Sequence, residues 1–304
     1  MNTEPIAWIA ADWGTSNLRC WAMSADHRVL EKRESTQGMG TLSGQGGAFE
    51  TALLELIGPW LQNDRLIPVH ACGMVSARGG WLEVPYEEAP CPAKTSVTKI
   101  PTRNSQIEVF VHAGVCQTHP ADVMRGEETQ ISGFLAGQPE FSGTLCLPGT
   151  HTKWVTVAEG TIRTFRTCIT GEMFDLLSSR SVLRHTIATD GWNESAFLSA
   201  VKTSREKPAA MLNECFRLRA EAVLRNLDGV EARSRLSGLL IGQELSGSLN
   251  AASFDSPVIV IGAPELTQIY RTALEFLGIS VKCHSAESCV LLGLAQTVNR
   301  LKRP

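Results

Sequence analysis

The stretch from Ile6 to Trp21 constrains the fold most, because it reads as a buried strand, a tight turn and a second strand. The first strand ends in an acid, Asp12, and the turn contains Gly14, Thr15, Ser16 and Asn17. Glycine lets the backbone turn tightly and approach a ligand, and N–H groups and hydroxyls in such a turn suit phosphate oxygens. Asp12 is placed to hold a metal ion or its water shell. An ordinary hairpin with a buried acid is the alternative.

A second turn of the same type lies within residues 143–157. It contains Gly149, Thr150, His151, Thr152 and Lys153. Gly-Thr at the tips of both hairpins predicts that two halves of the molecule bind one polyphosphate from opposite sides. The alternative is that the two hairpins are unrelated and merely share common turn residues. The chain has no G-x-x-x-x-G-K-[ST] segment, which excludes a P-loop, and no G-x-G-x-x-G opens a helix after a strand, which disfavours a Rossmann cofactor site.

Composition excludes several classes of protein. The chain has 304 residues, 43% hydrophobic and 19% charged, which is ordinary for a globular protein of two domains or lobes. The net charge of −3 and the absence of a basic block disfavour nucleic acid as a partner. Nine scattered cysteines without a C-x-x-C pair indicate reduced thiols. With no signal peptide and no long apolar run, we expect a cytoplasmic protein that has no membrane partner.

Hydrophobic periodicity predicts an α/β order. Predicted strands cover residues 6–12, 17–24, 27–34, 66–72, 106–115, 144–148, 152–157, 161–166, 257–261 and 281–284. Predicted helices cover residues 48–62, 127–136, 171–180, 193–203, 209–226, 231–249, 264–277 and 287–299. Four prolines in residues 82–105 predict little regular structure there. A three-strand meander with a Gly-Thr turn thus occurs twice, which indicates an internal repeat of pattern rather than of residue identity.

This arrangement resembles the sugar kinase/actin/heat-shock ATPase superfamily. Within it, motifs that span residues 12 to 242 resemble the 2-dehydro-3-deoxygalactonokinase family. They are Asp12-Trp13-Gly14-Thr15-Ser16-Asn17-Leu18-Arg19, Gly73-Met74-Val75, Met124-Arg125-Gly126-Glu127-Glu128-Thr129-Gln130, Pro148-Gly149-Thr150-His151-Thr152-Lys153-Trp154, Phe165-Arg166-Thr167, Thr170-Gly171-Glu172 and Ser237-Gly238-Leu239-Leu240-Ile241-Gly242. Their order and spacing together are specific.

The resemblance implies a two-lobed, actin-like (ribonuclease H-like) α/β fold with a mixed sheet and flanking helices in each lobe and a cleft between the lobes. We expect an N-terminal lobe at residues 1–125, with the first hairpin and a sugar-acid loop, and a C-terminal lobe at residues 126–304, with the second hairpin and an adenosine site. The implied reaction is ATP-dependent phosphorylation of the C6 hydroxyl of 2-dehydro-3-deoxygalactonate in cytosolic galactonate breakdown, with Mg²⁺ accompanying ATP.

In the superfamily, the catalytic carboxylate lies at the start of the helix before the second hairpin. That position falls on Arg125-Gly126-Glu127-Glu128, where the wider superfamily usually has an aspartate. Glu127 is the favoured base because it directly follows the glycine, Glu128 is its close rival, and Arg125 is counted among the catalytic candidates. Acids that simply favour the helix dipole are the structural alternative.

An anionic substrate requires an arginine or main-chain amides for its carboxylate. Arg78 and Arg166 are the leading candidates, and Arg125 is a third. For each, an ordinary surface arginine is an equal alternative. The whole loop from Gly73 to Trp81 is the predicted substrate-binding segment, and its named members are Gly73, Met74, Val75, Arg78 and Trp81.

The nucleotide candidates in the C-terminal half remain open in part. Gly262 and Ala263 follow the last core strand and open a helix where adenosine could lie, although many relatives have Gly-Gly in this turn. Glu265 and Gln243 are further candidates, and Lys153 could reach a phosphate or point to solvent.

Two other functions remain open: a kinase for another sugar or sugar acid, such as 2-dehydro-3-deoxygluconate, and a non-catalytic nucleotide-dependent regulatory module of the same fold. Whether the protein forms a homodimer is open as well.

Overall fold

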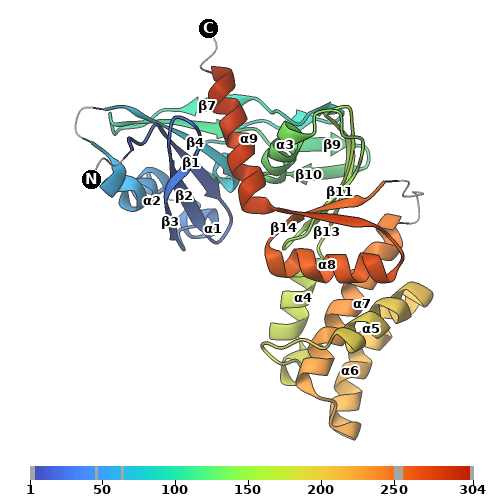
Figure 1. The fold of residues 1–304 in the computed structure, drawn as a ribbon. Helices are drawn as coiled ribbons and strands as arrows, with labels where there is room; N and C mark the ends of the chain where they lie inside the picture. Colours follow the sequence, from blue (N-terminus) through green and yellow to red (C-terminus); the bar gives the residue numbers. More distant parts are fainter. Residues whose placement is uncertain (1–3, 45–46, 63–64, 250–255, 302–304) are drawn as a thin grey trace. The chain divides into compact units, whose positions relative to one another are not determined.

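The structure is a computed structural model that describes residues 4–44, 47–62, 65–249 and 256–301 (Figure 1). The chain forms two compact units. The first contains residues 1–142, 157–164 and 286–304, and the second contains residues 143–156 and 165–285. Each unit is therefore assembled from separate stretches of the chain.

The first unit is built on a six-stranded sheet in the order β3-β2-β1-β4-β8-β7. Its strands are β1 (Trp8–Trp13), β2 (Leu18–Met23), β3 (Val29–Ser35), β4 (Ile67–Gly73), β7 (Val97–Ile100) and β8 (Ile107–His112). β1 pairs antiparallel with β2 and parallel with β4, and β4 pairs parallel with β8. A three-stranded sheet contains β5 (Glu87–Glu88), β9 (Val115–Thr118) and β10 (Ala121–Met124).

Alternate residues of β1 face opposite sides of this sheet. Ile9, Ala11 and Trp13 lie in one core with residues of α2 (Ala48–Ile57). Trp8 and Ala10 lie in another core with residues of α9 (Ala286–Leu301). Full burial of each such large apolar side chain stabilises the fold by roughly 1.5–3 kcal/mol. The run of apolar residues before Asp12 is thus explained by burial of both faces of the strand.

α9 packs beside α3 (Glu127–Gly137) in the first unit (Figure 1). A Cβ atom on Gly133 would overlap the carbonyl oxygen of Cys289, and one on Gly293 would overlap that of Thr129. Only glycine permits this approach of the two helices. The expected lobe boundary after residue 125 therefore does not coincide with the units, because helix packing places residues 126–142 and 286–304 in the first unit.

The second unit repeats the strand order of the first. β11 (Gly143–Leu147), β12 (Thr152–Ala158), β13 (Thr161–Cys168), β14 (Val258–Gly262) and β15 (Val281–Ser285) lie in the order β15-β14-β11-β12-β13. β14 pairs parallel with both β11 and β15, as β4 does with β1 and β8. When the edge strand β7 of the first sheet and the edge strand β6 (Cys91–Pro92), which pairs with β13, are set aside, both sheets have the order third, second, first, fourth, fifth. The predicted repeat of pattern and the mixed-sheet class are confirmed.

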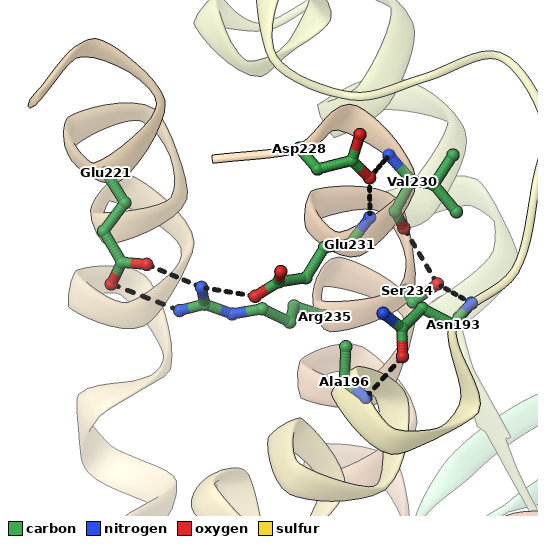
Figure 2. Close-up of polar contacts among 8 residues, drawn as sticks. All are labelled: Asn193, Ala196, Glu221, Asp228, Val230, Glu231, Ser234 and Arg235. Carbon is green, nitrogen blue, oxygen red and sulfur yellow. Dashed lines mark hydrogen bonds and ion pairs between the residues drawn. The ribbon is translucent and has the colours of Figure 1, made fainter. Parts of the chain in front are cut away.

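Two helices of the second unit, α5 (Glu194–Glu206) and α7 (Gly229–Leu249), begin at residues whose side chains cap them (Figure 2). Asn193 Oδ1 accepts from the Ala196 N–H at the start of α5 at 3.0 Å. Asp228 accepts from two main-chain N–H groups at the start of α7. Capping by Asn193 and Asp228 contributes about 0.5–2 kcal/mol for each helix. Separately, the Arg235 guanidinium of α7 binds Glu221 of α6 (Met211–Arg225) at 2.6 Å.

The sequence prediction was incomplete in several places, and it missed the strand β10 altogether. Residues 82–105 were predicted to have little regular structure, and their strands are short: the two-residue β5 and β6 (Cys91–Pro92), and β7, which pairs with β8. The predicted strand 106–115 is divided into β8 and the start of β9. The short helix α1 (Met39–Leu42) was missed. Prolines do not prevent short edge strands, because an edge strand tolerates missing donors.

Candidate functional site

Asp12 lies at the end of β1, beside the end of β4. Its side chain is 26% exposed and forms an ion pair with Arg19, its cross-strand partner in β2, at 3.7 Å. Burial raises the pKa of Asp12, the Arg19 charge lowers it, and the Glu127 charge raises it again. Asp12 and Glu127 are therefore electrostatically coupled carboxylates in the first unit, and the sequence prediction treated them separately.

Two acids in the first turn of α3 differ in environment. Glu128 is fully buried, whereas Glu127 is partly exposed. Burial, followed by the Glu127 charge, raises the pKa of Glu128 to about 8. Glu128 also accepts from the Gly126 N–H at 2.7 Å, and Glu127 accepts from the Arg125 N–H at 3.0 Å. Burial thus favours the protonated form of Glu128, while Glu127 is the more accessible of the two acids.

Two glycines bring the strand ends and α3 close together. Gly73 has φ of +89°, and a Cβ there would lie 2.6 Å from the Trp13 carbonyl oxygen. Gly126 has φ of +108°, and a Cβ there would lie 3.3 Å from the Gly73 Cα. Side chains are strained in both conformations. Asp12, Gly73 and Glu127 therefore lie in one region of the first unit, which the sequence prediction did not state.

Arg125 holds the loop that follows β4. Its Nη1 donates to Ser76 Oγ at 2.7 Å, and its Nη2 donates to the Val84 carbonyl at 2.9 Å. The guanidinium lies 4.1 Å from the centroid of the Tyr86 ring. Ser76 in turn donates to the His112 carbonyl at 2.7 Å. Arg125 thus has partners within the fold, and these partners were not foreseen from sequence.

The Gly73–Trp81 loop presents its predicted substrate residues unequally. Val75 is fully buried in the core, and Met74 is partly buried. Trp81 packs against Trp13 at a ring-centroid distance of 6.2 Å, so its role includes core packing. Arg78 is exposed. Arg78 is therefore the side chain of this loop that is best placed to meet a soluble anion.

The first hairpin turn is supported by α1 and the residue before it. The N–H of Gly40 donates to the Thr15 carbonyl at 2.8 Å, and that of Gly38 donates to the Ser16 carbonyl at 3.2 Å. The Gly14 N–H donates within the turn to the Asn17 carbonyl at 2.9 Å. This N–H is thus already bonded, while the side chains of Thr15, Ser16 and Asn17 are exposed.

The second hairpin turn contacts α4 (Thr170–Ser179) in the second unit. The N–H of Glu172 donates to the Thr150 carbonyl at 3.0 Å, and His151 Nε2 lies 2.7 Å from a Glu172 carboxylate oxygen. A Cβ on Gly171 would overlap the Gly149 carbonyl oxygen. The motif Thr170-Gly171-Glu172 therefore fixes the turn Gly149–His151, which explains why both occur in one pattern.

A pocket of about 880 Å³ lies in the second unit beside this turn. α4, α7, α8 (Pro264–Phe276) and the turn line it, together with residues 191–194. Its polar and charged lining residues are Thr150, Thr170, Glu172, Asp175, Glu194, Arg233, Ser237, Glu265, Gln268, Tyr270 and Thr272. The guanidinium of Arg233 lies 5.0 Å from the ring centroid of Phe174, another lining residue. This volume is in the range of small-molecule sites.

The remaining predicted residues of the second unit lie around the pocket or apart from it. Gly262 packs on the Pro148 ring, where a Cβ would lie 3.2 Å away, and Ala263 is the exposed N-cap of α8. Lys153 is buried rather than turned to solvent. Arg166 donates to the Gly247 carbonyl at 2.6 Å, and with Gln243 it lines a second hollow of about 270 Å³.

Comparisons with known proteins identify the family. A family model described as 2-keto-3-deoxy-galactonokinase matches residues 12–297. The chain belongs to this family. It is therefore a carbohydrate kinase. It is 37% identical to a probable 2-dehydro-3-deoxygalactonokinase of Rhizobium meliloti over 95% of each chain. It is 32% identical to the 2-dehydro-3-deoxygalactonokinase of Escherichia coli over 94% of this chain and 96% of that one.

Solved structures support the fold of the kinase. A crystal structure of a Sinorhizobium meliloti protein, provisionally assigned as a 2-dehydro-3-deoxygalactonokinase, is 35% identical, with a TM-score of 0.88 over 98% of this chain and 100% of that one. The activator of a 2-hydroxyisocaproyl-CoA dehydratase from Clostridium difficile shares the fold at 12% identity, with a TM-score of 0.51 over 98% of this chain and 97% of that one. The kinase has the expected actin-like α/β fold.

The acidic residues of the kinase are compatible with Mg²⁺. The described residues contain no group of three or more His, Cys, Asp or Glu side chains able to hold a metal ion. Magnesium bound with a nucleotide needs only one or two carboxylates besides phosphates and water. Asp12 carries hard oxygen atoms of the kind that Mg²⁺ binds. A cation there would counter the burial and the Glu127 charge that raise the pKa of Asp12.

Several side chains of the candidate site were not singled out from the sequence. Phe174, Trp192 and Arg233 line the pocket, and Ser76, Val84 and Tyr86 surround the Arg125 side chain. The motifs at residues 170–172 and 237–242 pointed to α4 and α7 without indicating which helix face meets the pocket.

All nine cysteines are free, and no described helix is long and apolar enough to span a membrane.

Proposed function

We propose that this kinase transfers the γ-phosphoryl group of ATP to the C6 hydroxyl of 2-dehydro-3-deoxygalactonate, giving the 6-phosphate and ADP. The family match over residues 12–297 carries this proposal, and the names of the two curated relatives support the acceptor. The reaction belongs to galactonate breakdown. It takes place in the cytoplasm, where ATP is available.

Glu127 acts as the base. Its partly exposed carboxylate accepts the proton of the C6 hydroxyl as that oxygen forms a bond to the γ-phosphorus. The bond from the γ-phosphorus to the bridging oxygen breaks at the same time, and ADP leaves with the electron pair. Glu128, fully buried with a pKa of about 8, instead fixes the start of α3 through the Gly126 N–H.

The pocket of the second unit binds the nucleotide. Its position beside Gly149 and Thr150 allows a phosphate chain to reach the hairpin turn while the base and ribose occupy the space lined by α4, α7 and α8. The activator from Clostridium difficile was solved with bound ADPNP, which is consistent with nucleotide binding by this fold. The proposed surroundings of the nucleotide also include the candidate residues His151, Thr152, Lys153, Gly262 and Ala263.

The exposed turn residues Thr15, Ser16 and Asn17 and the carboxylate of Asp12 contact phosphate oxygens or the ion that accompanies them. Asp12 is the residue that would hold Mg²⁺ or its water shell. When bound, the ion neutralises charge on the phosphates.

Arg78 binds the carboxylate of the sugar acid. Arg125 already donates to Ser76 and Val84, and Arg166 already donates to Gly247. Arg78 is exposed in the Gly73–Trp81 loop and is available for bidentate pairing with a carboxylate.

The test is an ADP-release assay with ATP, Mg²⁺ and a panel of acceptors: 2-dehydro-3-deoxygalactonate, its gluconate epimer and neutral hexoses. We expect strong turnover with the galactonate-derived acid. Turnover with the gluconate epimer alone would still support a sugar-acid kinase but would change the acceptor that we assign to it. Absence of acceptor-dependent ADP release with the whole panel would contradict the proposal.

A further inference from the structure

A buried carboxylate in the second unit accepts hydrogen bonds from three separate elements. Glu244, in α7, is only 6% exposed. It accepts from the Trp154 indole N–H of β12 at 2.8 Å, from the Tyr270 hydroxyl of α8 at 2.9 Å, and from the Thr170 hydroxyl that opens α4. Burial of a carboxylate is unfavourable unless donors of this kind compensate it.

The chain of hydrogen bonds continues to the second hairpin. Thr152 Oγ1 lies 2.9 Å from the Tyr270 hydroxyl oxygen, and the Thr152 side chain is fully buried. A tyrosine hydroxyl has one proton, and in this arrangement it is donated to Glu244. The Thr152 hydroxyl must therefore donate to Tyr270, so that both protons are directed toward the carboxylate.

Glu244 is also connected to the second hairpin through a second set of contacts, which begins at Thr170. Thr170 is the first residue of α4, and the two residues after it contact the turn: the Glu172 N–H donates to the Thr150 carbonyl, and Gly171 lies against Gly149. Glu244 is thus connected to both sides of the turn, through Thr152 and through Thr170. It is absent from the lining of the large pocket, whereas Thr150, Thr170 and Tyr270 line it.

We propose that Glu244 is a positioning residue for the nucleotide: through Tyr270, Thr152 and Thr170 it fixes the turn Gly149–Thr152 in the conformation that receives the phosphates. The inference rests on the proposed function, because it assigns the nucleotide to this pocket. An apolar residue in place of Glu244 would leave the donors of Trp154, Tyr270 and Thr170 without this acceptor. Glu244 matters here because it fixes the orientation of the side chains that donate hydrogen bonds to it.

The experiment measures Mg-ADP binding by titration calorimetry without any sugar acid. Glu244→Gln replaces one of the two carboxylate oxygens with an NH2 group, which cannot accept a hydrogen bond from any of the three donors. Thr152→Val removes the hydroxyl but keeps the volume, and Thr152→Ser keeps the hydroxyl. We expect ADP affinity to fall roughly 3- to 30-fold in Glu244→Gln and Thr152→Val. Thr152→Ser should bind as the wild type does.

Steady-state kinetics supply the second readout. KM for ATP should rise with the ADP dissociation constant, while KM for the sugar acid stays unchanged. The matched control is Glu221→Gln, which removes an acid that pairs with α7 through Arg235 away from the pocket (Figure 2). It should leave ADP affinity unchanged.

Several results would overturn the inference: unchanged ADP affinity in Glu244→Gln or Thr152→Val despite a lower unfolding temperature, equal loss in Thr152→Ser, or equal loss in Glu221→Gln. If Glu244→Gln does not fold, the Thr152 pair decides the question by itself. Failure of the wild type to bind ADP would instead contradict the proposed function.

Discussion

Glu128 accepts a hydrogen bond from the Gly126 N–H at 2.7 Å, and this contact joins the buried acid of α3 to the glycine that precedes the helix. The neighbouring Glu127 remains partly exposed. The two adjacent acids therefore lie in different environments, because one is enclosed by the fold and the other is partly exposed.

We predict that Glu127→Gln lowers kcat by about 10²–10⁴, the usual contribution of a general base. Glu128→Gln should retain most of kcat, since a neutral amide resembles a protonated carboxyl. The measurement is kcat for both variants under saturating ATP and sugar acid. A larger loss in Glu128→Gln than in Glu127→Gln would reverse the assignment.

The raised pKa of Glu128, about 8 against 4.5 for the ordinary side chain, predicts a pH dependence of stability. The folded state retains a proton that the unfolded state loses, so the contribution to stability is complete below about pH 4.5 and is lost as pH rises through 8. We expect the unfolding temperature of the wild type to fall between pH 5 and 8 more steeply than that of Glu128→Gln. Parallel curves would show that Glu128 titrates normally.

Arg78→Ala should raise KM for the sugar acid by about tenfold or more, because a charge-assisted pair with the carboxylate is lost. Its unfolding temperature should remain unchanged, since the side chain is exposed. Arg78→Lys, which keeps the charge but not the bidentate geometry, should give an intermediate KM. An unchanged KM for the acid in Arg78→Ala would remove this residue from the site.

Arg125→Ala should act mainly on stability. It removes two hydrogen bonds, to Ser76 and Val84, and the contact with the Tyr86 ring. Hydrogen bonds to charged groups contribute about 1.5–3 kcal/mol each, so we expect a loss of at least about 2 kcal/mol in the free energy of unfolding. Denaturant titration measures it. A loss of activity at full stability would instead indicate direct contact with the substrate.

The contact of α3 with α9 predicts a sharp contrast between glycines of one helix. Gly133→Ala would overlap the Cys289 carbonyl oxygen and should strongly destabilise the first unit, whereas a Cβ on Gly137, at the end of α3, meets nothing within 4 Å. Gly137→Ala should be neutral or stabilising by about 0.5–1 kcal/mol. Chemical denaturation of both variants tests this, and equal stability would contradict the close packing of the helices.

Local pattern predicted most of the fold because both sheets have clear alternation and turn signals. The strand that ends at Asp12 and the helix that begins at Glu127 were predicted within a few residues of their bounds. The extent of each unit could not be predicted, since it depends on Gly133 and Gly293 meeting across more than 150 residues. Long-range packing of this kind leaves no local signal.

The candidate site was predictable where a motif fixed the backbone, as with Gly73, Gly126 and the Gly149 turn. Side-chain partners were not, because sequence does not show which face of a helix or loop is enclosed. Val75 and Lys153 illustrate this, since both were candidates for ligand contact and both are buried. Glu244 carried no signal beyond its place after the motif at residues 237–242.

The most direct measurement is identification of the product by ³¹P nuclear magnetic resonance after incubation with Mg-ATP and 2-dehydro-3-deoxygalactonate. We expect one ADP for each new phosphomonoester, with the phosphorus split into a triplet by the two protons on C6. ADP with inorganic phosphate alone, or a phosphorus coupled to a single proton at another carbon, would contradict transfer to the C6 hydroxyl.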